Sequence, residues 1–216
     1  MSELDLLRGL PQGKRNIKQR ETAKTQALID LSREYGADYF DGSRDVGYGG
    51  YRYDGRWVPV ARDIIAHYGL MPGDRILDVG CAKGFLVKDL LAEGIDAYGV
   101  DVSHYALLNC EPEVVGRLHI GSAERLPVPD ASFAVVLAIN TLHNLKKPDL
   151  IAALHEMERL ATRGKFLQVD SYRTEAEKEI FESWVLTAYT HDYPDGWRRI
   201  FDEAGYTGDY NWTLIN

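Results

Sequence analysis

The chain has 216 residues, 45% of them hydrophobic and 27% charged, which is the composition of a folded domain of ordinary size. Its formal net charge of −8 excludes a broadly basic surface of the kind that binds nucleic acid or an anionic membrane. Cys81 and Cys110 form neither a disulfide framework nor a metal-ligand spacing, and no apolar run reaches the roughly 18 residues of a membrane span. The first residues also lack the apolar core of a signal peptide. We therefore expect a cytoplasmic protein without nucleic-acid, membrane or metal partners.

The first third of the chain has weak and interrupted patterns. Residues 1–16 are polar and broken by Pro and Gly, so we expect them to be loose, whereas 17–35 have helical spacing that Gly36 ends. Residues 38–57 are dense in Gly, Tyr, Arg and Asp, which predicts an irregular loop, either a plain surface loop or one that faces a ligand. Helical spacing returns at 56–68.

From residue 74 onward, apolar strands alternate with helices. The expected strands are 75–79, 97–100, 118–120, 133–139 and 165–169, with a closing pair at 206–210 and 212–215. The expected helices are 85–92, 104–110, 150–160, 174–190 and 194–204. This alternation predicts an α/β fold with a doubly wound, mainly parallel, seven-stranded sheet and helices on both faces. We expect residues 61–216 to form this compact domain and residues 1–60 to form an N-terminal helical lid or substrate segment.

A turn of small residues follows the first predicted strand, in the order Asp78-Val-Gly80-Cys-Ala82-Lys-Gly84. Such a turn lets the backbone approach a ligand closely and directs the N-terminus of the next helix towards it. A dinucleotide fingerprint requires glycines at offsets 0, 2 and 5, but the bulky Phe85 occupies the last of these positions. The pattern therefore disfavours NAD.

An acidic residue ends the second predicted strand. Asp101 lies 21 residues after Gly80, the distance at which an acidic side chain accepts hydrogen bonds from ribose hydroxyls. The alternative is a purely structural role, in which Asp101 or Ser103 caps the helix that follows.

Two polar segments flank the strand predicted at 133–139. The loop Gly121-Ser122-Ala123-Glu124 precedes it, and Asn140 and His143 follow it. Ligands in open α/β sheets bind beyond the carboxyl ends of the strands, which places Asn140 at the cofactor. We expect His143 to act as a general base, with packing inside the fold as the alternative.

These motifs, within residues 74–170, resemble those of the class I S-adenosylmethionine (SAM)-dependent methyltransferases, which have a Rossmann-like fold. The resemblance implies SAM as the cofactor and S-adenosylhomocysteine as the product. In that family the small-residue turn contacts the methionine part of SAM and the acid binds both ribose hydroxyls. The resemblance assigns cofactor binding to Asp78, Gly80, Ala82, Gly84, Asp101, Val102, Ser122, Ala123, Glu124 and Asn140. Ala82 replaces the family's middle glycine, and Ser122 stands where an aspartate is common.

Aromatic and basic side chains outside the sheet are the candidates for substrate contact. The two segments are 47–57 and 189–197. They supply the predicted substrate residues Tyr48, Tyr53, Arg56, His191 and Tyr193, and Tyr51 is a second candidate for accepting the proton. Arginines in the first segment could hold a carboxylate or phosphate, or could pair with neighbouring aspartates on the surface; both readings stay open.

These features predict an enzyme that transfers a methyl group to O or N of a small polar molecule, which could be anionic, sugar-linked or a secondary metabolite. Two alternatives remain. One is a non-catalytic SAM-binding regulatory or partner subunit, and the other is a protein methyltransferase. We expect a monomer or a homodimer.

Overall fold

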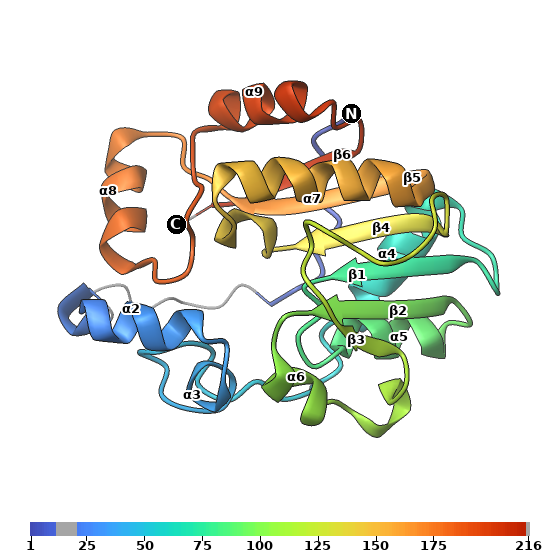
Figure 1. The fold of residues 1–216 in the computed structure, drawn as a ribbon, viewed down its shortest axis with the longest axis horizontal. Helices are drawn as coiled ribbons and strands as arrows, with labels where there is room; N and C mark the ends of the chain where they lie inside the picture. Colours follow the sequence, from blue (N-terminus) through green and yellow to red (C-terminus); the bar gives the residue numbers. More distant parts are fainter. Residues whose placement is uncertain (12–20, 215–216) are drawn as a thin grey trace.

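A computed structural model of the chain describes residues 1–11 and 21–214. Six strands form one sheet in the order β3-β2-β1-β4-β5-β6, and every neighbouring pair is parallel. The strands are β1 (Arg75–Val79), β2 (Asp96–Asp101), β3 (Leu118–Ile120), β4 (Phe133–Ile139), β5 (Ala161–Asp170) and β6 (Asp209–Thr213). All carboxyl ends therefore lie at one edge of the sheet (Figure 1). The prediction of a doubly wound parallel sheet is confirmed.

The predicted seventh strand is wrong within the described part of the chain. The expected closing pair is the single strand β6, which runs parallel to β5. Gly205 ends the preceding helix in the left-handed conformation, at φ +61°, and the Tyr206 hydroxyl donates to the Asp209 carbonyl. Residues 206–208 form the turn that connects α9 to β6, so they do not form a strand. Residue 215 lies outside the described residues.

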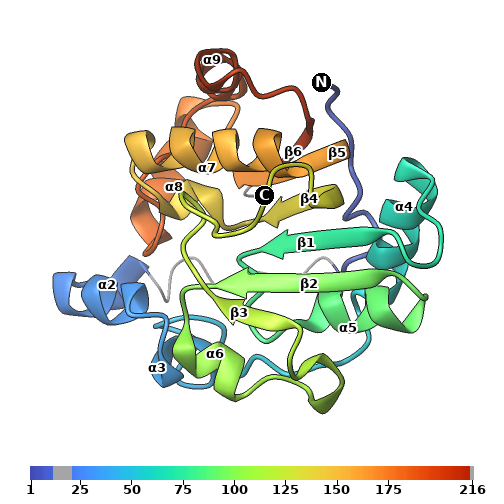
Figure 2. The ribbon, with the colours of Figure 1, turned by 45° about the vertical axis from the view of Figure 1, so that its right-hand side comes forward.

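Helices cover both faces of the sheet. They are α2 (Gln26–Arg33), α3 (Ala37–Phe40), α4 (Val58–Tyr68), α5 (Phe85–Ala92), α6 (His104–Leu108), α7 (Lys147–Leu160), α8 (Glu175–Trp184) and α9 (Pro194–Ala204), with short 3-10 helices η1 (Pro112–Val114) and η2 (Leu142–Asn144). Figure 2 shows α7 and α9 on one side of the sheet and α4 and α5 on the other. No helix among the described residues is both long and apolar enough to cross a bilayer.

The central strand β4 explains why both faces are covered. Side chains alternate along a strand, so Val136 and Ala138 pack in the core beneath α7 and α9. Val135 and Leu137 pack on the opposite side with α4 and α5. A strand that is apolar at successive positions is stable only when neither face meets water.

Helix α8 is shorter than the predicted helix 174–190. It ends at Trp184, and the backbone N–H groups of Tyr189 and Thr190 both donate to the His143 carbonyl at 3.0 Å. These bonds draw the chain back towards the end of β4, which is incompatible with a continuous helix.

The prediction that the N-terminus is loose is wrong for residues 1–11. The backbone N–H of Leu4 donates to the Tyr210 carbonyl at 2.8 Å, and that of Tyr210 donates to the Ser2 carbonyl at 3.0 Å. Leu6 and Leu7 are buried in the core beside α4. The segment covers the outer edge of β6, which removes an unpaired strand edge. Residues 12–16 and the start of the predicted helix, 17–20, lie outside the described residues.

Helices α2 and α3 and the loop that follows them lie beyond the carboxyl ends of the strands (Figure 1). This is the position expected of a lid. Residues 1–11 also precede residue 60 but pack on the body of the domain instead. The division of the chain at residue 60 therefore stays a prediction.

We predict that Leu6→Ala lowers the free energy of unfolding by about 2–4 kcal/mol, because it empties a site that is only 4% exposed. Denaturant unfolding measures this change. Arg8→Ala is the control, since Arg8 forms an exposed ion pair with Asp63 and solvent screens such pairs, so little change is expected. Equal small effects of both substitutions would show that the N-terminal segment does not pack on the core.

Candidate active site

The turn after β1 is closed tightly against the end of β4. Gly80 has φ +81°, and a Cβ atom there would lie 2.1 Å from the Thr141 hydroxyl oxygen, so only glycine fits. Gly84 has φ +75° and forms the N-cap of α5. Ala82 also has a positive φ, +50°, which explains why a glycine would suit this position. The alanine keeps the same backbone course.

Asp101 holds this turn from the neighbouring strand. Its Oδ2 accepts a hydrogen bond from the Ala82 N–H at 2.8 Å, and its Oδ1 accepts one from the Ser103 N–H at 2.8 Å. Burial raises the pKa of Asp101, and these N–H donors act in the opposite direction. Ser103, as predicted, caps α6 by accepting from the Ala106 N–H, and its hydroxyl donates to the Tyr35 carbonyl at 2.6 Å. Both roles predicted for the end of β2 are therefore compatible.

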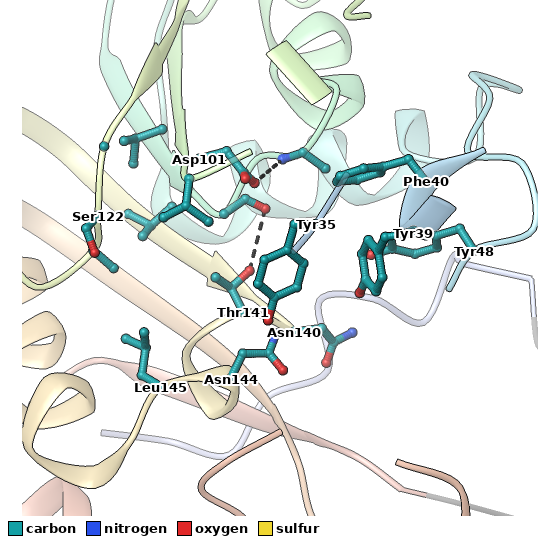
Figure 3. A pocket seen from close by; sticks show the side chains of 17 residues that line it. Tyr35, Tyr39, Phe40, Tyr48, Asp101, Ser122, Asn140, Thr141, Asn144 and Leu145 are labelled. Atoms are coloured by element: carbon teal, nitrogen blue, oxygen red, sulfur yellow. Dashed lines mark hydrogen bonds between the residues drawn. The ribbon is translucent and has the colours of Figure 1, made fainter. Parts of the chain in front are cut away.

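A pocket opens where the turn, the ends of β2 and β4, and the lid meet (Figure 3). Its lining residues are Tyr35, Tyr39, Phe40, Tyr48, Val79, Gly80, Ala82, Val100, Asp101, Val102, Gly121, Ser122, Ala123, Asn140, Thr141, Asn144 and Leu145. Seven of the ten residues predicted for the cofactor are thus brought together around one cavity. The other three, Asp78, Gly84 and Glu124, lie outside its lining.

These three residues lie in or next to the elements that form the pocket. Asp78 is buried within β1, where burial and the nearby Asp101 raise its pKa to about 7. Gly84 begins α5, and Glu124 accepts a hydrogen bond from the Ser122 hydroxyl. A carboxyl group with such a raised pKa is neutral over much of the range in which other aspartates are charged.

A chain of hydrogen bonds fixes the amide of Asn140. The Gln168 Nε2 donates to the Thr213 hydroxyl at 2.9 Å, and that hydroxyl donates to the Asn140 Oδ1 at 2.7 Å. Because Thr213 engages the amide oxygen of Asn140, the amide nitrogen is the atom that can donate a hydrogen bond to a ligand in the pocket. Asn140 has φ +54°, a conformation that asparagine tolerates better than most residues.

The predicted base His143 does not line the pocket. Its side chain is 5% exposed, Nδ1 accepts from the Asp170 backbone N–H at 3.1 Å, and Nε2 lies 3.4 Å from Asp170 Oδ2. Its carbonyl also accepts the two N–H groups that end the α8 segment. This geometry agrees with the alternative in which His143 packs inside the fold. The role of His143 as a general base stays a prediction.

The second predicted proton acceptor, Tyr51, is also outside the lining. Its ring stacks on Phe85 with the centroids 4.6 Å apart, and burial raises its pKa well above the ordinary value. A tyrosine in this environment stays protonated near neutral pH, which does not favour a base.

Four of the five predicted substrate residues are engaged elsewhere. The Tyr53 hydroxyl donates to Asp89 at 2.6 Å, and Arg56 forms an ion pair with Asp54. His191 lies against the Tyr172 hydroxyl at 3.2 Å, and the Tyr193 hydroxyl donates to Glu175. Only Tyr48 lines the pocket. The reading in which Arg56 pairs with a neighbouring aspartate is the one that the structure shows.

Sequence reasoning missed most of the lid's contribution. Tyr35, Tyr39 and Phe40 line the pocket beside Tyr48, and the rings of Tyr39 and Tyr48 meet edge-on at 5.2 Å. Figure 3 shows the Tyr35 ring lying across the pocket, between Asp101 and the asparagines. The density of aromatic residues at 35–40 was the available signal. Thr141, Asn144 and Leu145 were also missed as lining residues.

The described lining has a distinctive charge pattern. Asp101 is its sole carboxylate, and it contains no arginine, lysine or histidine. Burial raises the pKa values of Tyr35 and Tyr48, so both hydroxyls are hydrogen-bond donors near neutral pH. The pocket thus combines aromatic faces, hydroxyls and carboxamides without a cation.

A family model described as a methyltransferase domain matches residues 77–169. This part of the chain is therefore similar to methyltransferase domains, and curated relatives that match it are methyltransferases. The match runs from within β1 to the end of β5 and includes the turn, Asp101 and Asn140. The predicted cofactor class is confirmed with it.

Three relatives place the domain among methyltransferases. The demethylmenaquinone methyltransferase of Mycobacterium sp. (strain KMS) is 32% identical over 59% of this chain and 55% of that protein. The ubiquinone biosynthesis O-methyltransferase of Alkalilimnicola ehrlichii is 32% identical over 49% and 45%, and the 27-O-demethylrifamycin SV methyltransferase of Amycolatopsis mediterranei is 30% identical over 48% and 42%. The chain therefore spans about half the length of the curated relatives it matches.

Solved structures confirm the fold. The YcgJ protein of Bacillus subtilis has a TM-score of 0.55 at 17% identity, over 67% of this chain and 66% of that one. The methyltransferase in the Haloferax volcanii complex with the Trm112 activator has a TM-score of 0.54 at 21% identity, with the same two coverages.

We predict that Asp78→Asn flattens the pH dependence of stability in this domain. The pKa of Asp78 is raised to about 7, so its contribution to stability is full below about pH 4 and is lost as the pH rises through 7. Relative to the wild type, the variant should gain up to about 1.4 kcal/mol per pH unit over this range. Denaturant unfolding between pH 5 and 8 measures the difference. Profiles of the variant and the wild type that run parallel over this range would contradict the prediction.

We predict that Thr213→Val weakens SAM binding about threefold to tenfold, because it breaks the relay that orients Asn140 and one hydrogen bond contributes about 1 kcal/mol. Calorimetric titration measures the affinity. Thr162→Val is the matched control, since the Thr162 hydroxyl donates to the Phe133 carbonyl at the far end of β5. Equal affinities for both variants would show that the relay does not act on the ligand.

Proposed function

We propose that the chain transfers the methyl group of SAM to an oxygen or nitrogen atom of a neutral small molecule. The observation that carries the proposal is the Asp101 carboxylate. It lies in the pocket 21 residues after Gly80, held by the Ala82 and Ser103 N–H groups. The sequence relatives support methylation of small molecules, since their names refer to quinone and rifamycin precursors.

The pocket residues fit an adenosyl cofactor. Each oxygen of Asp101 accepts one backbone N–H bond and keeps accepting capacity for ribose hydroxyls. Val100 and Val102 offer apolar surface beside it, and Ser122 and Ala123 close the same side for an adenine ring. Gly80 and Ala82 leave the backbone open to the methionine part. Bound SAM supplies a methyl group already activated by its sulfonium.

The lid side of the pocket supports a neutral acceptor. Tyr35, Tyr39, Phe40 and Tyr48 present aromatic faces and hydroxyls, which suit a ring-containing molecule with polar substituents. The expected anion-binding role of Arg56 receives no support, because its guanidinium is committed to Asp54 outside the lining. An acceptor carrying a carboxylate or phosphate would meet Asp101 with no cation in the described lining to balance it.

Catalysis in this proposal rests on positioning. Among the described lining residues there is no imidazole or amine to remove a proton, and the ring of His143 is engaged with Asp170. The Asn140 amide and the tyrosine hydroxyls orient the acceptor atom, and the closed lid excludes water from the methyl group. The acceptor proton is released to solvent when the lid opens, since no described lining residue is placed to act as a base.

We predict that Asp101→Asn raises the dissociation constant for SAM at least tenfold, because hydrogen bonds to a charged acceptor contribute about 1.5–3 kcal/mol each. Calorimetric titration with SAM and with S-adenosylhomocysteine measures both affinities. Asp202→Asn, distant from the pocket, is the control and should bind both as the wild type does. An unchanged affinity of the folded Asp101→Asn protein would overturn the cofactor assignment.

A further inference from the structure

Lys83 is an unusual residue for its position. It stands between Ala82 and Gly84 in the cofactor turn, yet its side chain is only 8% exposed. A buried ammonium is unfavourable unless a partner compensates its charge. Its Nζ donates to Asp41 Oδ2 at 2.6 Å and to the Tyr51 carbonyl at 3.0 Å. Both partners belong to the lid, and neither belongs to the sheet.

Asp41 collects hydrogen bonds from three directions. Besides Lys83, the Tyr105 hydroxyl donates to its Oδ2 at 2.8 Å and the Tyr51 N–H donates to its Oδ1 at 3.1 Å. Burial opposes the charge of Asp41, but the bonds from Lys83, Tyr105 and Tyr51 prevail and lower its pKa. The carboxylate is therefore ionised at neutral pH, and the contact with Lys83 is an ion pair.

This ion pair connects two walls of the same pocket. Asp41 is the C-cap of α3 and directly follows Phe40, one of the aromatic lining residues. Lys83 directly follows Ala82, whose N–H is bonded to Asp101. A displacement of the lid that opens the pocket must therefore separate Asp41 from Lys83 or move the cofactor turn.

We propose that Lys83 and Asp41 are positioning residues: their ion pair, buried on the Lys83 side and partly exposed on the Asp41 side, holds the aromatic lid shut over the cofactor, so that its separation limits how fast the cofactor leaves. The proposal rests on the proposed function, since it concerns the same pocket. Other contacts hold the lid as well. The Ser103 hydroxyl donates to the Tyr35 carbonyl, and the Tyr51 ring stacks on Phe85. The ion pair differs from them because one of its members lies within the cofactor turn itself.

A different role for Lys83 would be direct attraction of the carboxylate group of the cofactor. The two roles predict opposite effects of Asp41→Asn. Removing the charge of Asp41 would free the ammonium and strengthen direct attraction. In the lid role the same substitution loosens the lid and speeds dissociation, as Lys83→Met does.

The chain provides a matched control pair. Lys165 donates to Glu158 at 2.6 Å, the same separation as in Lys83–Asp41, and its side chain is 14% exposed. This pair joins β5 to α7, away from the lid. Lys165→Met and Glu158→Gln therefore remove an ion pair of similar length and burial without touching the pocket.

The first measurement is the dissociation rate of S-adenosylhomocysteine, by stopped-flow displacement, for the wild type, Lys83→Met, Asp41→Asn, their double variant and the two controls. We expect each single variant to accelerate dissociation about tenfold, the double variant to be no faster than either, and the controls to match the wild type. Acceleration by Lys83→Met with slower dissociation from Asp41→Asn would overturn the proposal in favour of direct attraction.

The second measurement is trypsin cleavage, read by mass spectrometry, because it separates lid opening from global unfolding. Arg44 and Arg52 lie exposed in the lid, whereas Arg163 lies on β5. We expect Lys83→Met and Asp41→Asn to be cut several-fold faster than the wild type at Arg44 and Arg52, and at the wild-type rate at Arg163. If the wild type binds S-adenosylhomocysteine but both variants show unchanged cleavage and unchanged dissociation, the proposed role of the ion pair is refuted and the proposed function is not. Failure of the wild type to bind would refute the proposed function instead.

Discussion

The Asp101 carboxylate is the interaction on which the rest of the site depends. It lies at the end of β2 and accepts one N–H bond from the turn after β1 and another from the start of α6. Ser103, which donates the second bond, also holds the lid through the Tyr35 carbonyl. One partly buried acid therefore holds the turn that lines the pocket and connects, through Ser103, to the lid. The geometry requires burial of a charge, and the backbone donors compensate for it.

The body and the lid of the protein follow different constraints. The sheet must bring the ends of β1, β2 and β4 to one edge, and continuous apolar strands covered on both faces achieve this. The lid instead presents aromatic side chains to the pocket. It consists of the short helices α2 and α3 and a loop, and individual contacts such as Lys83–Asp41 hold it to the body. We infer that the body determines the cofactor and the lid determines the acceptor.

Most of the fold, and the gathering of seven predicted residues around one pocket, could be predicted because both are encoded locally. Strand β4 is an uninterrupted apolar run, and Gly80, Asp101 and Asn140 stand at strand ends that a parallel sheet must bring together. The acceptor side could not, because it depends on long-range packing. The sequence does not show that Arg56 turns to Asp54, or that the ring of His143 is held by Asp170. Likewise, the sequence does not show that the backbone of Ser2 and Leu4 bonds to β6, or that Leu6 and Leu7 pack beside α4.

A crystal structure of the protein with S-adenosylhomocysteine tests the account most directly. The account predicts the ribose hydroxyls against the Asp101 carboxylate, the sulfur atom facing the wall of Tyr35, Tyr39 and Tyr48, and the ion pair of Lys83 with Asp41 intact. A ligand bound elsewhere, or bound in the pocket with its ribose away from Asp101, would contradict the central claim that this carboxylate organises the cofactor site.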